Sequence, residues 1–258
     1  MAGRRARRRG GRSRLRWTVW VGAAAAALSV AASGVVRAAA TGALAAPIEH
    51  GPSNVRAMAF ACNVVWGTQY VLPIARAFQA VHGRATFFLG GAWAAAHPAE
   101  ARRLRSMGME IASHGHSHRH VASLSLDENL AEIDRANAAI RAATGATPRL
   151  YAPAYGEVNA TVREAAAARS MPVVLWSIDT IDWRAWQTAP VIERRVLARA
   201  APGAIVLIHP TDRTLAALPH LLAALRREGY RLTTVSDLLQ PGAGGTTSRP
   251  PTAAIGVR

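Results

Sequence analysis

The sequence of 258 residues contains no lysine and only one cysteine, and its 15 acidic residues are outnumbered by 31 basic ones. A single cysteine excludes an internal disulfide and a thiolate zinc site, so we expect Cys62 to be a small core residue. The lack of lysine beside abundant arginine and alanine indicates a GC-rich coding bias. Aromatic residues make up 6% of the chain and do not interleave with a basic stripe, so we expect no nucleic-acid partner.

Much of the positive charge lies at the amino terminus. The formal net charge is +16, but eight arginines fall within the first sixteen residues. Trp17–Val36 then runs for twenty residues without a charge, and small residues ending in AAATGALAAP follow. This pattern is typical of an export signal, and the run is also long enough for an uncleaved membrane anchor with its arginines in the cytoplasm. We expect an extracytoplasmic protein, secreted or anchored; a disordered basic tail followed by an alanine-rich helix is the alternative.

These features divide the chain into three parts. Residues 1–46 form the basic amino terminus with its signal or anchor, and residues 47–240 form a single folded domain. Residues 241–258 are rich in Gly, Pro, Ser and Thr and lack apolar periodicity, which indicates a flexible tail.

Within the domain, short apolar runs alternate with helical patterns. Strands are predicted at 55–62, 85–89, 109–112, near Leu150, and at 172–176, 204–208 and 231–235. Helices are predicted at 70–81, from Pro98 to Gly108, after a capping box of Ser125 and Glu128, at 161–169, from Pro190, and at 215–227. About seven strands, each followed by a helix, predict an α/β fold with a parallel sheet, and this number favours a closed barrel.

Polar residues follow the predicted strands directly. They are Asn63, His114 to His120, Pro153 to Glu157, Asp179 with Asp182, and His209. Because the active site of such a barrel lies at the carboxyl ends of its strands, we expect these five groups to meet at one mouth.

Four of the nine histidines stand at alternate positions in SHGHSHRH, residues 113–120. Imidazole is a common ligand of transition metals, and either His114 with His118 or His116 with His120 could meet one cation. The spacing does not choose between the two pairs, and a surface run without a metal is the alternative to both.

His209 ends an apolar strand and is followed by Pro210, a position suited to a general acid. Asp179 also ends a strand and could orient such a histidine through a hydrogen bond. Taken alone, each of the two could equally be an ordinary polar residue at a strand end.

Five segments together resemble the polysaccharide deacetylases of carbohydrate esterase family four, with their NodB-homology domain, over about 185 residues. They are RATFFLGG, GMEIASHGHSHRHVASLS, YAPAYGEVN, LWSIDTIDW and PGAIVLIHPTDRT. The resemblance implies a distorted (β/α)7 barrel, similar to a TIM barrel, that removes N-acetyl groups from amino-sugar polymers such as peptidoglycan or chitin. It also implies a divalent metal, zinc first, with cobalt or another divalent ion as alternatives.

The resemblance assigns roles to individual residues. It makes His114 and His118 the metal ligands, which leaves His116 and His120 as their neighbours. It makes His209 the catalytic acid, tuned by Asp179. In the substrate groove it implies a pocket for the acetyl methyl group at Leu207, a wall at Trp183, and a backbone N–H of Tyr155 that donates to the oxyanion.

The chain departs from the family's pattern in two places, in AFACNVVWG before these five segments and in YAPAYGEVN. Family members usually carry two adjacent aspartates, a general base and a third metal ligand, where this chain has Asn63 and Val64. An amide is no useful proton acceptor near neutral pH, and valine cannot bind a metal. The arginine that usually pairs with the base is replaced by Ala152. With NVVWG, YAPAYG and HPT, the chain resembles a divergent branch of the family, associated with spore-forming bacteria, that carries the same replacements.

Three functions therefore stand open. The first is a metal-dependent deacetylase of low activity, in which Asp179 or Asp182 could stand in as the base. The second is an inactive protein of the cell or spore envelope that binds an acetylated glycan between Trp66, Trp183 and Trp186, although each of these could equally be ordinary rim packing. The third is a membrane-tethered structural protein of the envelope.

Overall fold

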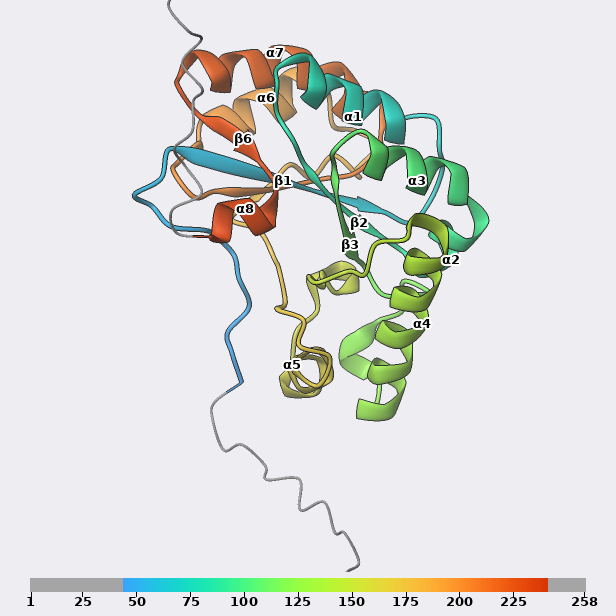
Figure 1. Ribbon diagram of the computed structural model, residues 1–258. Helices are drawn as coiled ribbons and strands as arrows, with labels where there is room; N and C mark the ends of the chain where they lie inside the picture. The colour runs from blue at the N-terminus through green and yellow to red at the C-terminus, as the bar shows by residue number, and fades with distance from the viewer. Residues whose placement is uncertain (1–43, 241–258) are drawn as a thin grey trace, which may run out of the picture. The chain divides into compact units, whose positions relative to one another are not determined.

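The computed structural model describes residues 44–240 (Figure 1). The predictions for the signal or anchor and for the carboxyl-terminal tail fall outside the described residues. In residues 44–240, no helix has the length and apolar character needed to cross a membrane.

Parallel strands form one sheet in the order β3-β2-β1-β5-β4, and β6 also pairs with β1. The strands are β1 (Ala57–Val64), β2 (Thr86–Leu89), β3 (Glu110–Ser113), β4 (Ile178–Asp179), β5 (Ile205–Ile208) and β6 (Arg231–Thr233). All of β1 is buried, because its two faces meet two different apolar layers. Alternation of parallel strands with helices confirms the predicted α/β class.

Helices cover the outside of the sheet. They are α1 (Val71–Ala80), α2 (Gly91–Ala96), α3 (Pro98–Ser106), α4 (Leu126–Thr144), α5 (Ala160–Ala167), α6 (Ala189–Leu197), α7 (Asp212–Arg227) and α8 (Val235–Leu239), with short 3₁₀ turns η1 (Val121–Ser123) and η2 (Ala154–Gly156). Helices α1, α6 and α7 lie together on one side of β1, and α4 and α5 lie on the opposite side (Figure 1). The capping box of Ser125 and Glu128 at the start of α4 is confirmed.

The predicted strand at 172–176 is largely irregular. Val173 and Val174 form only single bridges, to Tyr151 and Ile48, and the regular strand β4 comes later, at Ile178–Asp179. Sequence patterns also did not predict α2 or α8, since each has only five or six residues.

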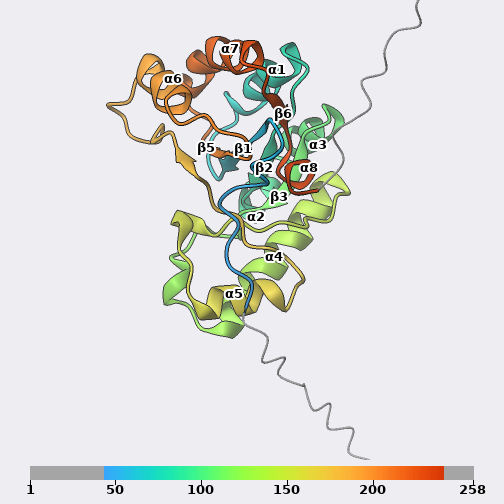
Figure 2. The same ribbon diagram turned by 90° about the vertical axis from the view of Figure 1, so that its left-hand side faces the viewer.

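Isolated bridges complete the wall of the barrel. Ser113 at the end of β3 pairs with Tyr151, Tyr151 pairs with Val173, and Val174 pairs with Ile48. His50 then pairs with Ala204, directly before β5, so the segment 48–50 occupies the gap in the ring. Figure 2 shows this first described segment, in blue, passing alongside the sheet. A ring made partly of single bridges is a distorted barrel.

Three apolar clusters fill the fold. The largest lies between the sheet and helices α1, α3 and α7, with Phe60, Phe78 and Phe87 fully buried. A second cluster fills the inside of the barrel around Ala59, Ala61 and Phe88. A third lies beneath α4 and α5.

Candidate functional site

A cavity of about 510 Å³ opens beside the carboxyl ends of the strands. Its lining residues are Asn63, Trp66, His114, His118, Tyr155, Gly156, Trp176, Asp179, Trp183, Leu207 and His209. All five polar groups expected at strand ends contribute to it, although they come from distant parts of the sequence. Convergence of the strand ends, predicted from the alternating pattern, is therefore seen in the structure.

The cavity distinguishes between the two histidine pairs. His114 and His118 line it, with ring centroids 5.3 Å apart. Nδ1 of His116 is instead buried with no hydrogen-bond partner within residues 44–240, and His120 is exposed, with Nδ1 2.7 Å from Oε1 of Glu157. The turn after β3 therefore presents the first and third histidines of the run to one space.

His114 is held in one orientation. Its Nδ1 lies 2.7 Å from the carbonyl oxygen of Ala152, which leaves Nε2 for a ligand. Burial lowers the pKa of His114 to about 3, and it lowers the pKa of the half-buried His118 as well, helped by His209 and His120. Both imidazoles are neutral at physiological pH, which is the form that binds a cation.

Asn63 and Val64 stand where family members usually carry two adjacent aspartates, and neither side chain is a carboxylate. Asn63 is buried, and its Oδ1 has no hydrogen-bond partner among the described residues. Val64 is fully buried in the core. Nowhere in residues 44–240 do three His, Cys, Asp or Glu side chains gather as a metal site would need. Two fixed, neutral imidazoles fit a divalent ion, but they supply only part of the shell that a catalytic zinc takes from protein.

His209 is oriented by Asp182, where we expected Asp179. The ring Nδ1 lies 2.8 Å from Oδ1 of Asp182, and the backbone N–H of His209 donates to Oδ2 at 2.6 Å. The hydroxyl of Thr214 donates to the same oxygen at 2.5 Å, and Asp182 is fully buried. Three hydrogen bonds therefore fix this carboxylate against His209 and Thr214.

Asp179 lies at the cavity wall with a different role. Its Oδ1 accepts the backbone N–H of Ile181 at 2.8 Å, so it shapes the turn that brings Asp182 to His209. Both aspartates stand in SIDTIDW, and their order along the strand end was not enough to choose between them. A signal that could have favoured Asp182 is its position directly before Trp183, which was expected to line the substrate groove.

Tyr155 adopts a left-handed backbone conformation, with φ of +58°. Its ring lies between two histidines, 4.4 Å from the centroid of His118 and 4.1 Å from that of His120. Glu157 holds His120 through the bond already described, so the ring of Tyr155 is braced from outside the cavity. Tyr155 thus lines the cavity with a strained backbone that its packed neighbours maintain.

Aromatic rings border the opening. Trp66 stacks on His209 at 5.7 Å between centroids, with 14° between the planes, and Trp183 carries the Arg184 guanidinium 4.1 Å above its ring. Both tryptophans are 45% exposed and also border a second, smaller cavity of about 340 Å³. Trp186 is 68% exposed and does not line either cavity. Trp176, which sequence reasoning missed, lines the main one.

Comparison with known proteins places this geometry in a family. The family model for polysaccharide deacetylase matches residues 52–174. The uncharacterized protein YlxY of Bacillus subtilis (strain 168) is 34% identical over 75% of this chain and 60% of its own length. A peptidoglycan-N-acetylglucosamine deacetylase of Listeria monocytogenes is 34% identical over 60% of this chain and 33% of its own length. The chain thus spans less than two thirds of these curated relatives.

Among solved structures, a CE4 family pseudoenzyme from Bacillus anthracis has a TM-score of 0.73 and 33% identity, covering 76% of this chain and 69% of that one. A mutant of a CE4 family pseudoenzyme, described as having restored enzymatic activity, matches with the same TM-score and 31% identity, covering 76% of this chain and 71% of that one. The parallel sheet with its surrounding helices agrees with these structural likenesses. The chain belongs to the polysaccharide deacetylase family, carbohydrate esterase family four.

Proposed function

We propose that this protein binds an N-acetylated amino-sugar polymer of the cell envelope, peptidoglycan or a chitin-like glycan, without turning it over. A single observation carries the proposal: the recognition parts of the cavity are kept, while Asn63 and Val64 stand where the family has its base and third metal ligand.

The cavity residues that the chain retains are suited to binding an acetylated sugar. Trp66 and Trp183 offer exposed aromatic faces on which sugar rings stack. Leu207 is an apolar wall for the acetyl methyl group, and the N–H of Tyr155 is a donor for the carbonyl oxygen. His209, held by Asp182, can hydrogen-bond the amide nitrogen of the same group.

The two replaced residues stand where hydrolysis needs a general base and a third metal ligand. An amide at position 63 cannot take a proton from water, and a positioned base is worth about 10²- to 10⁴-fold in rate. A divalent ion, zinc or cobalt, would polarise the acetyl carbonyl, and His114 and His118 would hold it. Val64 adds no ligand, so we expect such an ion to be bound weakly.

Slow deacetylation is the second candidate, because the His209–Asp182 pair is intact and is suited to protonating a leaving amine. In that case Asp179, at the cavity wall, is the carboxylate available as a base.

Two relatives support this proposal. One is named a deacetylase of peptidoglycan, which supports the kind of polymer, and one structural neighbour is described as a pseudoenzyme, which supports the lack of turnover. Action on such a polymer, together with the export signal or anchor predicted within residues 1–46, supports a place outside the cytoplasm, secreted or tethered to the membrane.

The experiment compares binding with acetate release. Calorimetry of the full chain with an N-acetylglucosamine tetramer should give binding that Trp66→Ala and Trp183→Ala weaken. Acetate release, followed with zinc or cobalt present, should be absent from the natural chain. The double variant Asn63→Asp with Val64→Asp should release acetate, and adding His209→Ala should abolish that release.

Two results would change the assignment. Acetate released by the natural chain and lost in His209→Ala would establish the second candidate. Failure to bind any acetylated oligomer, with or without metal, would refute both.

A further inference from the structure

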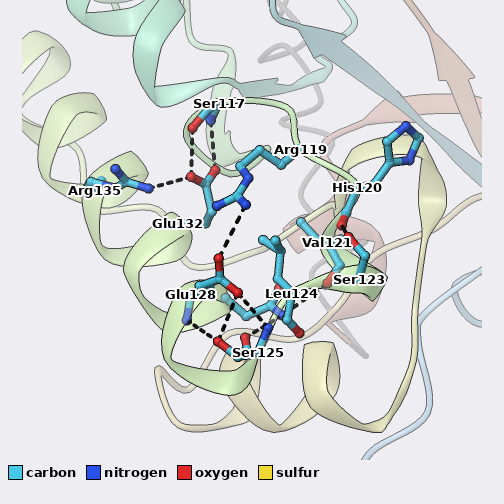
Figure 3. Close-up of polar contacts among 11 residues, drawn as sticks. Ser117, Arg119, His120, Val121, Ser123, Leu124, Ser125, Glu128, Glu132 and Arg135 are labelled. Carbon is cyan, nitrogen blue, oxygen red and sulfur yellow. Dashed lines mark hydrogen bonds and ion pairs between the residues drawn. The ribbon is translucent and has the colours of Figure 1, made fainter.

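We propose that Glu132 is a positioning residue that fixes the backbone after β3 and thereby holds His118 at the cavity. Glu132 lies on α4, outside the cavity, and is 1% exposed. Figure 3 shows its carboxylate directed at Ser117 on one side and Arg135 on the other.

The carboxylate binds the loop through three donors. Its Oε2 accepts the backbone N–H groups of His116 at 3.1 Å and of Ser117 at 2.8 Å. Its Oε1 accepts the hydroxyl of Ser117 at 2.7 Å. The residue directly before His118 is therefore held by both its backbone and its side chain.

The opposite edge of the same loop is held by α2. The N–H of Gly91 donates to the carbonyl of Gly115 at 2.9 Å, and the N–H of Ala92 donates to that of His116 at 3.1 Å. His114, at the start of the loop, donates its N–H to Leu89 at 2.9 Å. The backbone between the two cavity histidines is thus bound to two helices and a strand.

This loop needs such support because its conformation is strained. His118 has φ of +54°, in the left-handed region that non-glycine residues rarely adopt, whereas Gly115 adopts its φ of +74° without strain because it has no Cβ. A strained residue persists only when its surroundings fix it from several sides. Without the hydrogen bonds to Glu132, we expect the segment 116–118 to relax and His118 to leave its place beside His114.

Glu132 is a charged residue at a buried position, so its presence there needs an explanation. An ionised carboxylate inside a fold is unfavourable unless hydrogen-bond donors satisfy it. Burial alone would raise the pKa of Glu132, but hydrogen bonds from Ser117 and His116 and the Arg135 guanidinium together bring the pKa below its usual value. The helix face around it buries Ile133, Ala136 and Ile140, so an apolar residue would pack there. The donors of the loop explain why a carboxylate is present.

Variants can separate positioning from stability. Glu132→Gln keeps an oxygen for both backbone N–H groups and an amide that can donate to Ser117, whereas Glu132→Leu removes every acceptor. Ile140→Ala is the matched control, since it lies on the same helix, is fully buried and does not contact the loop. Arg135→Ala removes the ion pair with Glu132 and a bond to the carbonyl of Ala131, and leaves the acceptors of Glu132 for the loop in place.

The first measurement is hydrogen exchange on the natural chain. Ser117 is an exposed residue, and its backbone N–H donates to Glu132, so exchange of this amide reports on that hydrogen bond. We expect the Ser117 amide to exchange at least about 100-fold more slowly than an unbonded amide, and that protection to survive in Glu132→Gln. Exchange at the unprotected rate in the natural chain would overturn the proposal, whatever the protein binds.

The second measurement rests on the proposed function and uses zinc and the N-acetylglucosamine tetramer as probes. We expect Glu132→Leu to shift the ring resonances of His118 and to weaken binding of either probe by about tenfold. Glu132→Gln, Arg135→Ala and Ile140→Ala should stay within about twofold of the natural chain. Unchanged His118 resonances in a folded Glu132→Leu would refute the positioning role. If Glu132→Leu does not fold, the exchange of the Ser117 amide decides.

Discussion

Three hydrogen bonds converge on the buried carboxylate of Asp182, two from His209 and one from Thr214. Removing the carboxylate leaves these groups unpaired in the interior. We expect Asp182→Ala to lower the free energy of unfolding by about 3 kcal/mol, measured by urea denaturation with an unchanged slope.

Asp179→Ala is the control at the residue scale, because Asp179 is only partly buried and its carboxylate accepts a single bond, from Ile181. Asp179→Ala should lower the free energy of unfolding by about 1 kcal/mol. Equal losses for the two variants would contradict the assignment of Asp182 as the partner of His209.

The start of α4 depends on its cap. Ser125 accepts the N–H of Glu128, and the Glu128 side chain binds back to the N–H of Ser125. Ser125→Ala should lower the free energy of unfolding by about 1 kcal/mol, measured by thermal or urea unfolding. Thr188→Ala at the start of α6 should change it little, because the Thr188 side chain makes no capping bond. Equal effects would show that the cap is not what stabilises α4.

Entry into β5 depends on a glycine. Gly203 has φ of +84°, and a Cβ there would meet the backbone carbonyl of Gly51, in the segment that completes the ring. Gly203→Ala should cost at least about 2 kcal/mol of unfolding free energy, from strain and from the displaced segment.

Gly108→Ala separates these two causes, since Gly108 has φ of +79° but open space around its Cβ position. It should cost only the strain, about 1 kcal/mol. If both variants lost the same stability in urea unfolding, the contact between Gly203 and the segment 48–51 would not matter to the fold.

For the whole molecule, acid should weaken the contact between α4 and the segment after α5. Hydrogen bonds from Arg169 to Asp134, at 2.5 and 2.6 Å, lower the pKa of Asp134 below its ordinary value of 3.8. A lowered folded pKa means that the unfolded chain binds the proton more readily. The contribution is therefore present above pH 3.8 and is lost as the pH falls through the folded pKa.

The measurement compares the natural chain with Asp134→Asn in urea unfolding from pH 7 to pH 2. Both partners are partly exposed, so we expect a difference below about 1 kcal/mol at pH 7 that shrinks toward zero at the acid end. A difference that grew on acidification would contradict the sign.

Local patterns in the sequence determined the α/β class, most helices and strands, and the meeting of five strand ends at one mouth. These follow from periodicity and from the geometry of parallel strands, which act over a few residues. The five family segments then chose His114 and His118 from the histidine run, and both line the cavity.

Only the tertiary structure decided the partners of those residues. Asp182 rather than Asp179 binds His209, Glu132 holds the loop before His118, and the segment 48–50 closes the ring. Each of these contacts joins residues that are at least fifteen positions apart. The periodicity of one segment fixes its own faces but carries no record of which distant side chain meets them, because that choice is made by packing.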